Sequence, residues 1–257
     1  MRFAGATLHS LFSAFRSPSF LCCLPVGQPL RIIFTENNTS CAMKKVWFFL
    51  LFALPVALLT AQNDRYHTAM TAAVAQLDSA KGPADFQAAA NTFTRIAAAE
   101  PDQWLPHYYA AFSNLIYVFN TFGQDPAQAL RTLDVTQAGL DRAKTLAPGE
   151  SDVAVLQAYI LIGRVMENPM TKGAELSPRV FAELEKATAM DPANPRAPFL
   201  EGTYVLNMPE FYGGGASNAK PLFEKAAALF EKEKDRGLLP HWGRRINAQY
   251  LEKVSSK

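Results

Sequence analysis

Four prolines divide the chain at nearly even intervals, and this periodicity constrains the fold more than any other feature. Pro101, Pro148, Pro192 and Pro240 are separated by 47, 44 and 48 residues. A small residue stands ten places after each of the first three prolines, and an alanine stands five places before the second and third. Small residues at fixed places let paired helices approach closely, so the spacing predicts stacked helical hairpins. The small positions are Ala111, Ala158, Gly202, Ala143 and Ala187.

The composition around these prolines favours helix throughout. From Asn63 onward the sequence is rich in Ala, Leu, Glu, Lys and Gln, and it lacks the alternating β-branched runs that are typical of strands. A capping residue precedes proline, as at many helix starts, at Asp125, Ser177 and Asn194. The sequence predicts about nine helices, near 63–79, 83–98, 103–121, 125–146, 151–166, 177–190, 195–206, 217–234 and 240–254.

Two stretches in the second half resemble the tetratricopeptide repeat (TPR) family. KATAMDPANPRAPFLEG is similar to that family's junction between two repeats, and AKPLFEKA is similar to its second helix. The resemblance implies an all-α fold, an α-solenoid of stacked antiparallel helix pairs that winds as a right-handed superhelix. The residues that carry it are Ala187, Pro192, Gly202, Ala219, Phe223 and Ala226.

The chain also departs from the TPR pattern. The family's period is about 34 residues, so the longer spacing here requires longer helices or inserted loops. Ile96 replaces the alanine expected before Pro101, and Tyr250 stands where a small residue would follow Pro240. The alternative architecture is an irregular helical bundle without superhelical stacking.

The stretch MKKVWFFLLFALPVALLTAQ, which starts at Met43, has the layout of an export signal. Two lysines precede an uncharged apolar run that ends in small residues before Gln62. The run is shorter than the roughly 20 residues that cross a bilayer. A signal peptide that spans residues 43–61 and is cleaved after Ala61 is therefore favoured, rather than a permanent membrane anchor.

Residues 1–42 show no sustained helical or strand period, and we interpret them as a leader that precedes a true start at Met43. The alternative is a genuine N-terminal extension. The predicted mature chain, residues 62–257, is long enough for a single TPR-like domain. It carries 20 basic and 22 acidic residues without a basic stripe, so no nucleic-acid partner is expected. Every cysteine precedes it: Cys22, Cys23 and Cys41.

Residues 103–122 form the most aromatic segment of the chain. Trp104, Tyr108 and Phe112 recur at helical spacing, and further apolar residues cover the other sides. A helix that is apolar nearly all round is usually buried, so core packing is the first interpretation. The alternative is an aromatic ligand site that would include Trp104 and His107.

The stretch MPEFYGGGASNAK, residues 208–220, combines two large aromatics with three glycines. The glycines predict a loop between two helices. Phe211 and Tyr212 must either pack back onto the core or face a partner, because aromatic anchors are typical of binding sites. The loop resembles the YGG connector of periplasmic helical subunits of tripartite ATP-independent transporters, which implies a ligand-facing role for Gly213 and Gly214 as well.

The motifs of known catalysts are incomplete in this sequence. The glycine-rich run before Lys220 lacks the GK[ST] ending of a phosphate loop. The SxxK motif that starts at Ser217 occurs without the SDN and KTG motifs that accompany it in serine β-lactamases. His67, His107 and His241 have no metal-ligand spacing, so no metal or cofactor is expected. The Arg244 and Arg245 pair is either a solvated face or a site for a partner's carboxylate.

The sequence therefore predicts a non-catalytic, exported helical-repeat scaffold that binds a protein or peptide partner of the cell envelope on its concave surface. It would be periplasmic or secreted, without a stable membrane anchor after signal cleavage. The alternative is a periplasmic ligand-binding or transporter-accessory subunit that binds a small molecule. The residues expected at the binding site are Phe211, Tyr212, Gly213, Gly214, Trp104, His107, Arg244 and Arg245.

Overall fold

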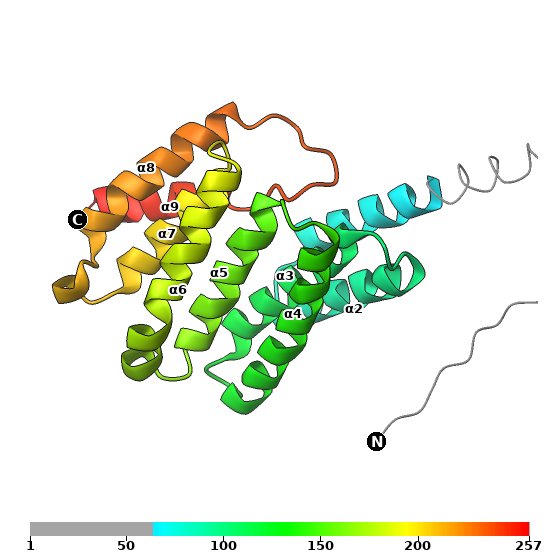
Figure 1. The fold of residues 1–257 in the computed structure, drawn as a ribbon, viewed down its shortest axis with the longest axis horizontal. Helices are drawn as coiled ribbons and strands as arrows, with labels where there is room; N and C mark the ends of the chain where they lie inside the picture. Colours follow the sequence, from blue (N-terminus) through cyan, green and yellow to red (C-terminus); the bar gives the residue numbers. More distant parts are fainter. Residues whose placement is uncertain (1–63, 257) are drawn as a thin grey trace, which may run out of the picture. The chain divides into compact units, whose positions relative to one another are not determined.

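The computed structural model describes residues 64–256 of the chain. The predicted leader over 1–42 and the predicted signal peptide over 43–61 lie outside the described residues. Within 64–256 the chain forms nine α-helices and one short 3-10 helix, with no strand (Figure 1). This confirms the all-α prediction.

The helices follow one another with short connectors, except before α9. Apart from α6 and α9, the predicted bounds agree with the structure to within two residues over the described range. The elements are a first helix over 64–78, α2 (Pro83–Ala99), α3 (Trp104–Thr121), α4 (Pro126–Leu146), α5 (Ser151–Val165), α6 (Pro169–Met190), α7 (Arg196–Asn207), the 3-10 helix η1 (Glu210–Tyr212), α8 (Ala216–Lys232) and α9 (Arg244–Ser255).

Two of the three capping residues act as the sequence indicates. The Asp125 side chain accepts a hydrogen bond from the backbone N–H of Gln128 at the start of α4. The Asn194 side chain accepts from the backbone N–H of Arg196, which begins α7. Each satisfies a backbone donor that the first turn of a helix leaves without a partner.

The predicted start at Ser177 and Pro178 is wrong. Helix α6 begins eight residues earlier, after Asn168, whose side chain accepts from the backbone N–H of Thr171. Pro178 lies inside the helix, where it removes a backbone donor. The Ser177 hydroxyl donates to the carbonyl of Gly173 and so supplies a hydrogen bond on the disrupted turn.

The predicted start of the last helix is also too early. Helix α9 begins at Arg244 after Gly243, which adopts a φ of 109° that favours glycine. The residues from Pro240 to Trp242 belong to the connector between α8 and α9 instead.

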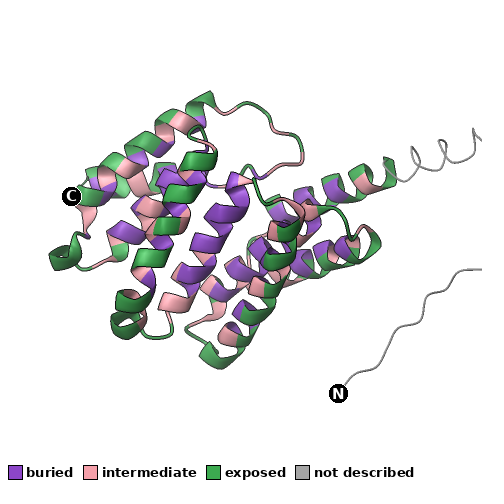
Figure 2. Cartoon of the chain, viewed as in Figure 1, coloured by how far each residue is buried: buried purple, intermediate pink, exposed green. Residues whose placement is uncertain are grey.

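Consecutive helices pack in pairs, α3 with α4, α5 with α6 and α7 with α8. Helices α3, α5 and α7 also contact one another in order, so the hairpins lie side by side. Burial follows one side of most helices, as Figure 2 shows, and α5 is buried almost all round. This arrangement agrees with stacked hairpins, while membership of the TPR family and the superhelical hand stay predictions.

The small positions singled out in the sequence are all buried. At Gly202 an added Cβ would lie 3.0 Å from the ring of Phe223 and 3.2 Å from Leu222. A glycine therefore lets α7 approach α8 closely at this point. The predicted packing residues that are buried are Ala111, Ala143, Ala158, Ala187, Gly202, Ala219, Phe223 and Ala226.

Candidate functional site

The connector between α8 and α9, residues 233–243, crosses the first helices of three successive hairpins, and we call it the strap. Trp242 stacks on Phe112 of α3 and on Tyr159 of α5, with ring centroids 5.0 and 5.9 Å apart. It meets Phe199 of α7 edge to face at 6.2 Å. Its indole N–H donates to the hydroxyl of Tyr108 at 2.9 Å. A single side chain thus ties three hairpins together.

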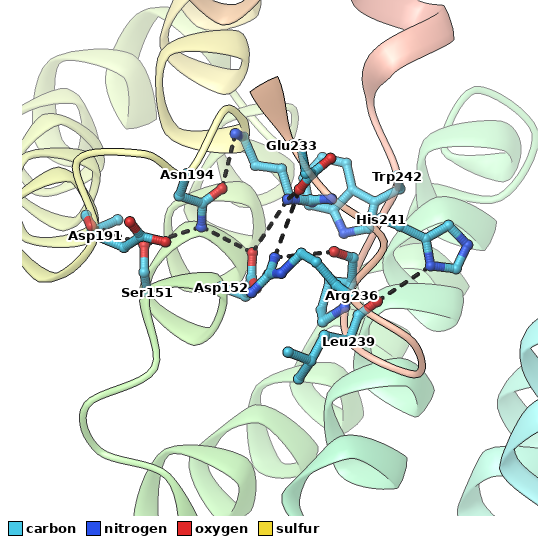
Figure 3. A network of polar contacts seen from close by, with 12 residues as sticks. Ser151, Asp152, Asp191, Asn194, Glu233, Arg236, Leu239, His241 and Trp242 are labelled. Atoms are coloured by element: carbon cyan, nitrogen blue, oxygen red, sulfur yellow. Dashed lines mark hydrogen bonds and ion pairs between the residues drawn. The ribbon is translucent and has the colours of Figure 1, made fainter. Parts of the chain in front are cut away.

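A buried ionic network fixes the other end of the strap (Figure 3). Arg236 donates to the carboxylate of Asp152 on α5 at 2.9 Å, and Asp152 is 1% exposed. Glu233 accepts from Arg196 of α7 at 2.7 Å. Burial alone would lower the pKa of Arg236, but the Asp152 carboxylate beside its guanidinium raises that pKa. Two cations and two anions balance, as buried charges require.

Arg196 is the most deeply buried charge of this network. Its side chain is 0% exposed, and its Nε and Nη2 atoms have no hydrogen-bond partner. The guanidinium lies 5.9 Å from the ring centroid of Phe230 and 5.8 Å from that of Trp242. These aromatic faces stabilise the cation where oxygen acceptors are missing.

Two further contacts hold the strap, one to α3 and one to the first helix. The Tyr109 hydroxyl donates to the carbonyl of Leu238 at 2.9 Å, and His241 lies 3.1 Å from the carboxylate of Asp78. The strap therefore contacts the first helix, α3, α5 and α7 through its own side chains and backbone.

Trp104 and His107 lie at the start of α3 and are half-buried. Trp104 packs edge to face on Tyr108, at a centroid distance of 5.8 Å. The Nε2 atom of His107 is buried without a partner. Burial, and then the charge of Arg142, lower the pKa of His107. Both residues contribute to packing at this end of the helix.

The two arginines of α9 differ in their surroundings. Both are exposed, and the Arg244 guanidinium lies 5.8 Å from the ring centroid of Phe230. The eight residues expected at a binding site thus occupy three separate places: the start of α3, the loop around η1 and the start of α9. The structure does not bring them together.

Phe211 and Tyr212 are the most exposed aromatic side chains among residues 64–256, at 75% and 64%. Their rings contact each other, with centroids 4.3 Å apart. They belong to η1 and project from the loop between α7 and α8. Of the two alternatives for this loop, the structure favours aromatics that face outward.

A groove of about 960 Å³ lies between the first helix and α2. One stripe of each helix lines it, and the four alanines of the lining, three of them on the first helix, leave room for the hollow. Arg65 stands on one wall and Arg95 on the other. No residue expected at the binding site lines this groove. The apolar lining residues are Ala69, Ala72, Ala73, Ile96 and Ala99.

Tyr66 also lines the groove, and its hydroxyl is buried without a hydrogen-bond partner. Burial, and then the charge of Glu100, raise the pKa of Tyr66 to about 12. The phenol is therefore protonated at neutral pH and can donate a hydrogen bond. The Glu100 carboxylate lines the groove as well, so the hollow combines an apolar surface with a polar donor, two cations and one anion. Such a surface suits an apolar ligand with a few polar groups.

Two further findings concern residues 64–256 as a set. No group of three or more His, Cys, Asp or Glu side chains is arranged there to hold a metal ion. No helix in that range is long and apolar enough to cross a bilayer.

The fold and the groove together define an all-α protein of stacked helix pairs with an open binding surface. A solved structure shares this fold: the HusA haemophore from Porphyromonas gingivalis, with a TM-score of 0.67 and 30% sequence identity. The match covers 74% of this chain and 93% of that chain, so the protein belongs to the family of the HusA haemophore. The sequence matches none of the known protein-family profiles and none of the curated proteins. A haemophore is a binding protein, which agrees with a non-catalytic binding role.

Proposed function

We propose that this protein is an exported, non-catalytic carrier of haem, and that the groove between the first helix and α2 holds the cargo. The observation that carries the proposal is the relationship to a haemophore, at 30% identity over 93% of that chain. The groove supplies a matching surface within the described part of the chain.

The groove suits the chemistry of haem. A porphyrin is a flat apolar ring with two carboxylates at one edge, and four alanines with Ile96 offer an apolar surface in the groove. Ligand sites commonly combine such a surface, within about 300–1,000 Å³, with a few polar groups. Arg65 and Arg95 can each pair with a carboxylate, and the Tyr66 phenol adds a donor.

Apolar contact supplies most of the affinity in this proposal. Arg65 and Arg95 are exposed, and an exposed ion pair contributes only about 0.2–1 kcal/mol. Replacing both arginines by glutamine should therefore weaken haem binding about 2- to 30-fold without abolishing it.

The proposal keeps one element of each function expected from the sequence. It retains the exported, non-catalytic character of the scaffold and the small-molecule ligand of the transporter-accessory alternative. Peptide binding on a concave surface is not part of this proposal.

A haem titration followed by absorbance tests the proposal. Ala69 lies at the centre of the groove stripe, and Ala75 is an exposed alanine of the same helix outside the groove. Wild type and Ala75→Trp should bind haem saturably with equal affinity, whereas Ala69→Trp should bind at least ten times more weakly. Absence of saturable binding to wild type would contradict the function. Equal affinity of both variants would place the cargo elsewhere.

A further inference from the structure

The loop of residues 208–215, which we call the aromatic loop, displays two large apolar side chains to solvent. Phe211 and Tyr212 are 75% and 64% exposed, and their closest ring contact is with each other. Aromatic rings normally bury most of their surface in a folded protein. The exposure of this pair therefore requires an explanation.

The three glycines of the aromatic loop are each required by its geometry. Gly213 and Gly215 have φ values of 85° and 95°, which side chains with a Cβ rarely adopt. A Cβ on Gly214 would overlap the carbonyl of Met208. A side chain with a Cβ at any of the three positions would therefore strain this turn.

Hydrogen bonds close the same turn. The N–H of Gly214 donates to the carbonyl of Pro209 at 3.1 Å, and the N–H of Gly215 donates to that of Val205 at 3.0 Å. The Asn218 side chain donates to the carbonyls of Gly213 and Gly214. The loop therefore holds the two rings in a fixed position, which lowers the entropic cost of binding.

The charge of the loop indicates the kind of partner. Glu210 is the sole charged residue in the stretch from Asn207 to Asn218, and it is exposed beside the rings. Segments that bind membrane surfaces usually bring lysines or arginines to anionic headgroups, and this stretch has none. A protein pocket with a cation at its rim fits an aromatic pair flanked by a carboxylate.

We propose that the aromatic loop docks into an apolar pocket of a cell-envelope protein, with the Glu210 carboxylate facing a cation at the rim of that pocket. The loop contributes no residue to the groove between the first helix and α2. Docking through this loop and cargo binding in the groove therefore use separate surfaces, and the inference does not depend on the identity of the cargo.

Binding of the purified, fluorescently labelled protein to envelope fragments of the cells that make it tests this inference. The test variant is Phe211→Ala with Tyr212→Ala. The matched control is Val135→Ala with Met170→Ala, since these apolar residues are 64% and 70% exposed on other helices. Wild type and control should bind saturably and with equal affinity. The test variant should bind at least ten times more weakly than wild type, and Glu210→Lys should bind several times more weakly.

Two further arms identify the partner class. Protease treatment of the fragments should abolish binding, and vesicles of extracted envelope lipids should not bind the protein. Equal binding of wild type and test variant, or no saturable binding by wild type, would overturn the inference. Loop-dependent binding that survives protease and recurs on lipid vesicles would replace the protein partner by a membrane. The test variant should still bind haem as wild type does, which separates this result from the carrier proposal.

Discussion

The two connectors on either side of α8 use aromatic residues in opposite ways. The strap places Trp242 against rings from three helices and pairs Glu233 and Arg236 with buried partners. The aromatic loop turns Phe211 and Tyr212 outward and leaves Glu210 exposed. An aromatic residue in a connector is therefore no signal for a partner by itself. The number of contacts that the rest of the chain provides decides its role.

Length and backbone chemistry explain the difference. The strap has enough residues to reach from the last hairpin to Asp78 in the first helix. The aromatic loop is short, and its consecutive glycines close it on itself through local hydrogen bonds. One connector stabilises the fold, and the other presents side chains.

Asp152→Ala should lower the free energy of unfolding most, because it leaves Arg236 and the buried Arg196 with less compensating charge. Removing one partner of a buried ion pair destabilises a protein by about 3–5 kcal/mol. Urea unfolding measures the change. Asp134→Ala removes an ion pair of similar length to Arg164, but Asp134 is 71% exposed, so this control should lose less than about 1 kcal/mol. Similar losses for both variants would show that the network does not hold the strap.

Trp242→Ala should lower the free energy of unfolding by about 3 kcal/mol, because it removes a large ring from between three helices. Trp242→Phe keeps a stacking ring and loses the indole donor to Tyr108, so about 1 kcal/mol is expected. Thermal and urea unfolding compare the two variants. A loss below about 1 kcal/mol for the alanine variant would mean that the strap contributes little to the fold.

Gly214→Ala should lower the free energy of unfolding by about 1–3 kcal/mol, since the added Cβ meets the backbone at Met208 and the loop must shift. Gly149→Ala is the matched control, because nothing lies within 4 Å of a Cβ there and its φ is not positive. Urea unfolding of both variants measures the difference. If Gly214→Ala is as stable as the control, the aromatic loop is not held rigidly.

Combined Phe211→Ala and Tyr212→Ala substitutions should have the smallest effect on stability, within about 0.5 kcal/mol, since exposed side chains away from packing contacts contribute little. The midpoint of thermal unfolding should therefore stay close to that of wild type. A loss above about 1.5 kcal/mol would show that the rings pack on the chain, and the contrast between the connectors would fail.

The helices could be predicted because their signals are local. Capping at Asp125 and Asn194 and the alanine-rich composition act within one or two turns of chain. The start of α6 was missed because two Asn/Ser–Pro pairs compete nearby, and Asn168 is the one that caps. Ser177 instead bonds to the hydroxyl of Tyr204, 27 residues away, which no local pattern reveals.

The strap and the groove could not be predicted, because each depends on residues far apart in the sequence. Trp242 and Tyr108 are 134 residues apart, and Asp152 and Arg236 are 84 apart. The groove needs one stripe of the first helix to face one stripe of α2, and the composition of each stripe alone is ordinary for a helix. The loop itself could be predicted, because its glycines end a helix. The sequence left open whether Phe211 and Tyr212 pack back onto the core or face outward, because that depends on contacts with the rest of the fold.

Hydrogen exchange of the backbone amides, measured with and without haem, locates the cargo site. We expect haem to slow exchange in the first helix and in α2, while the strap over 233–243 exchanges as before. Slower exchange in the strap or in α3, α5 and α7, with the first helix and α2 unchanged, would contradict this expectation. Haem would then bind on the face that the strap covers, and the groove would not be the cargo site.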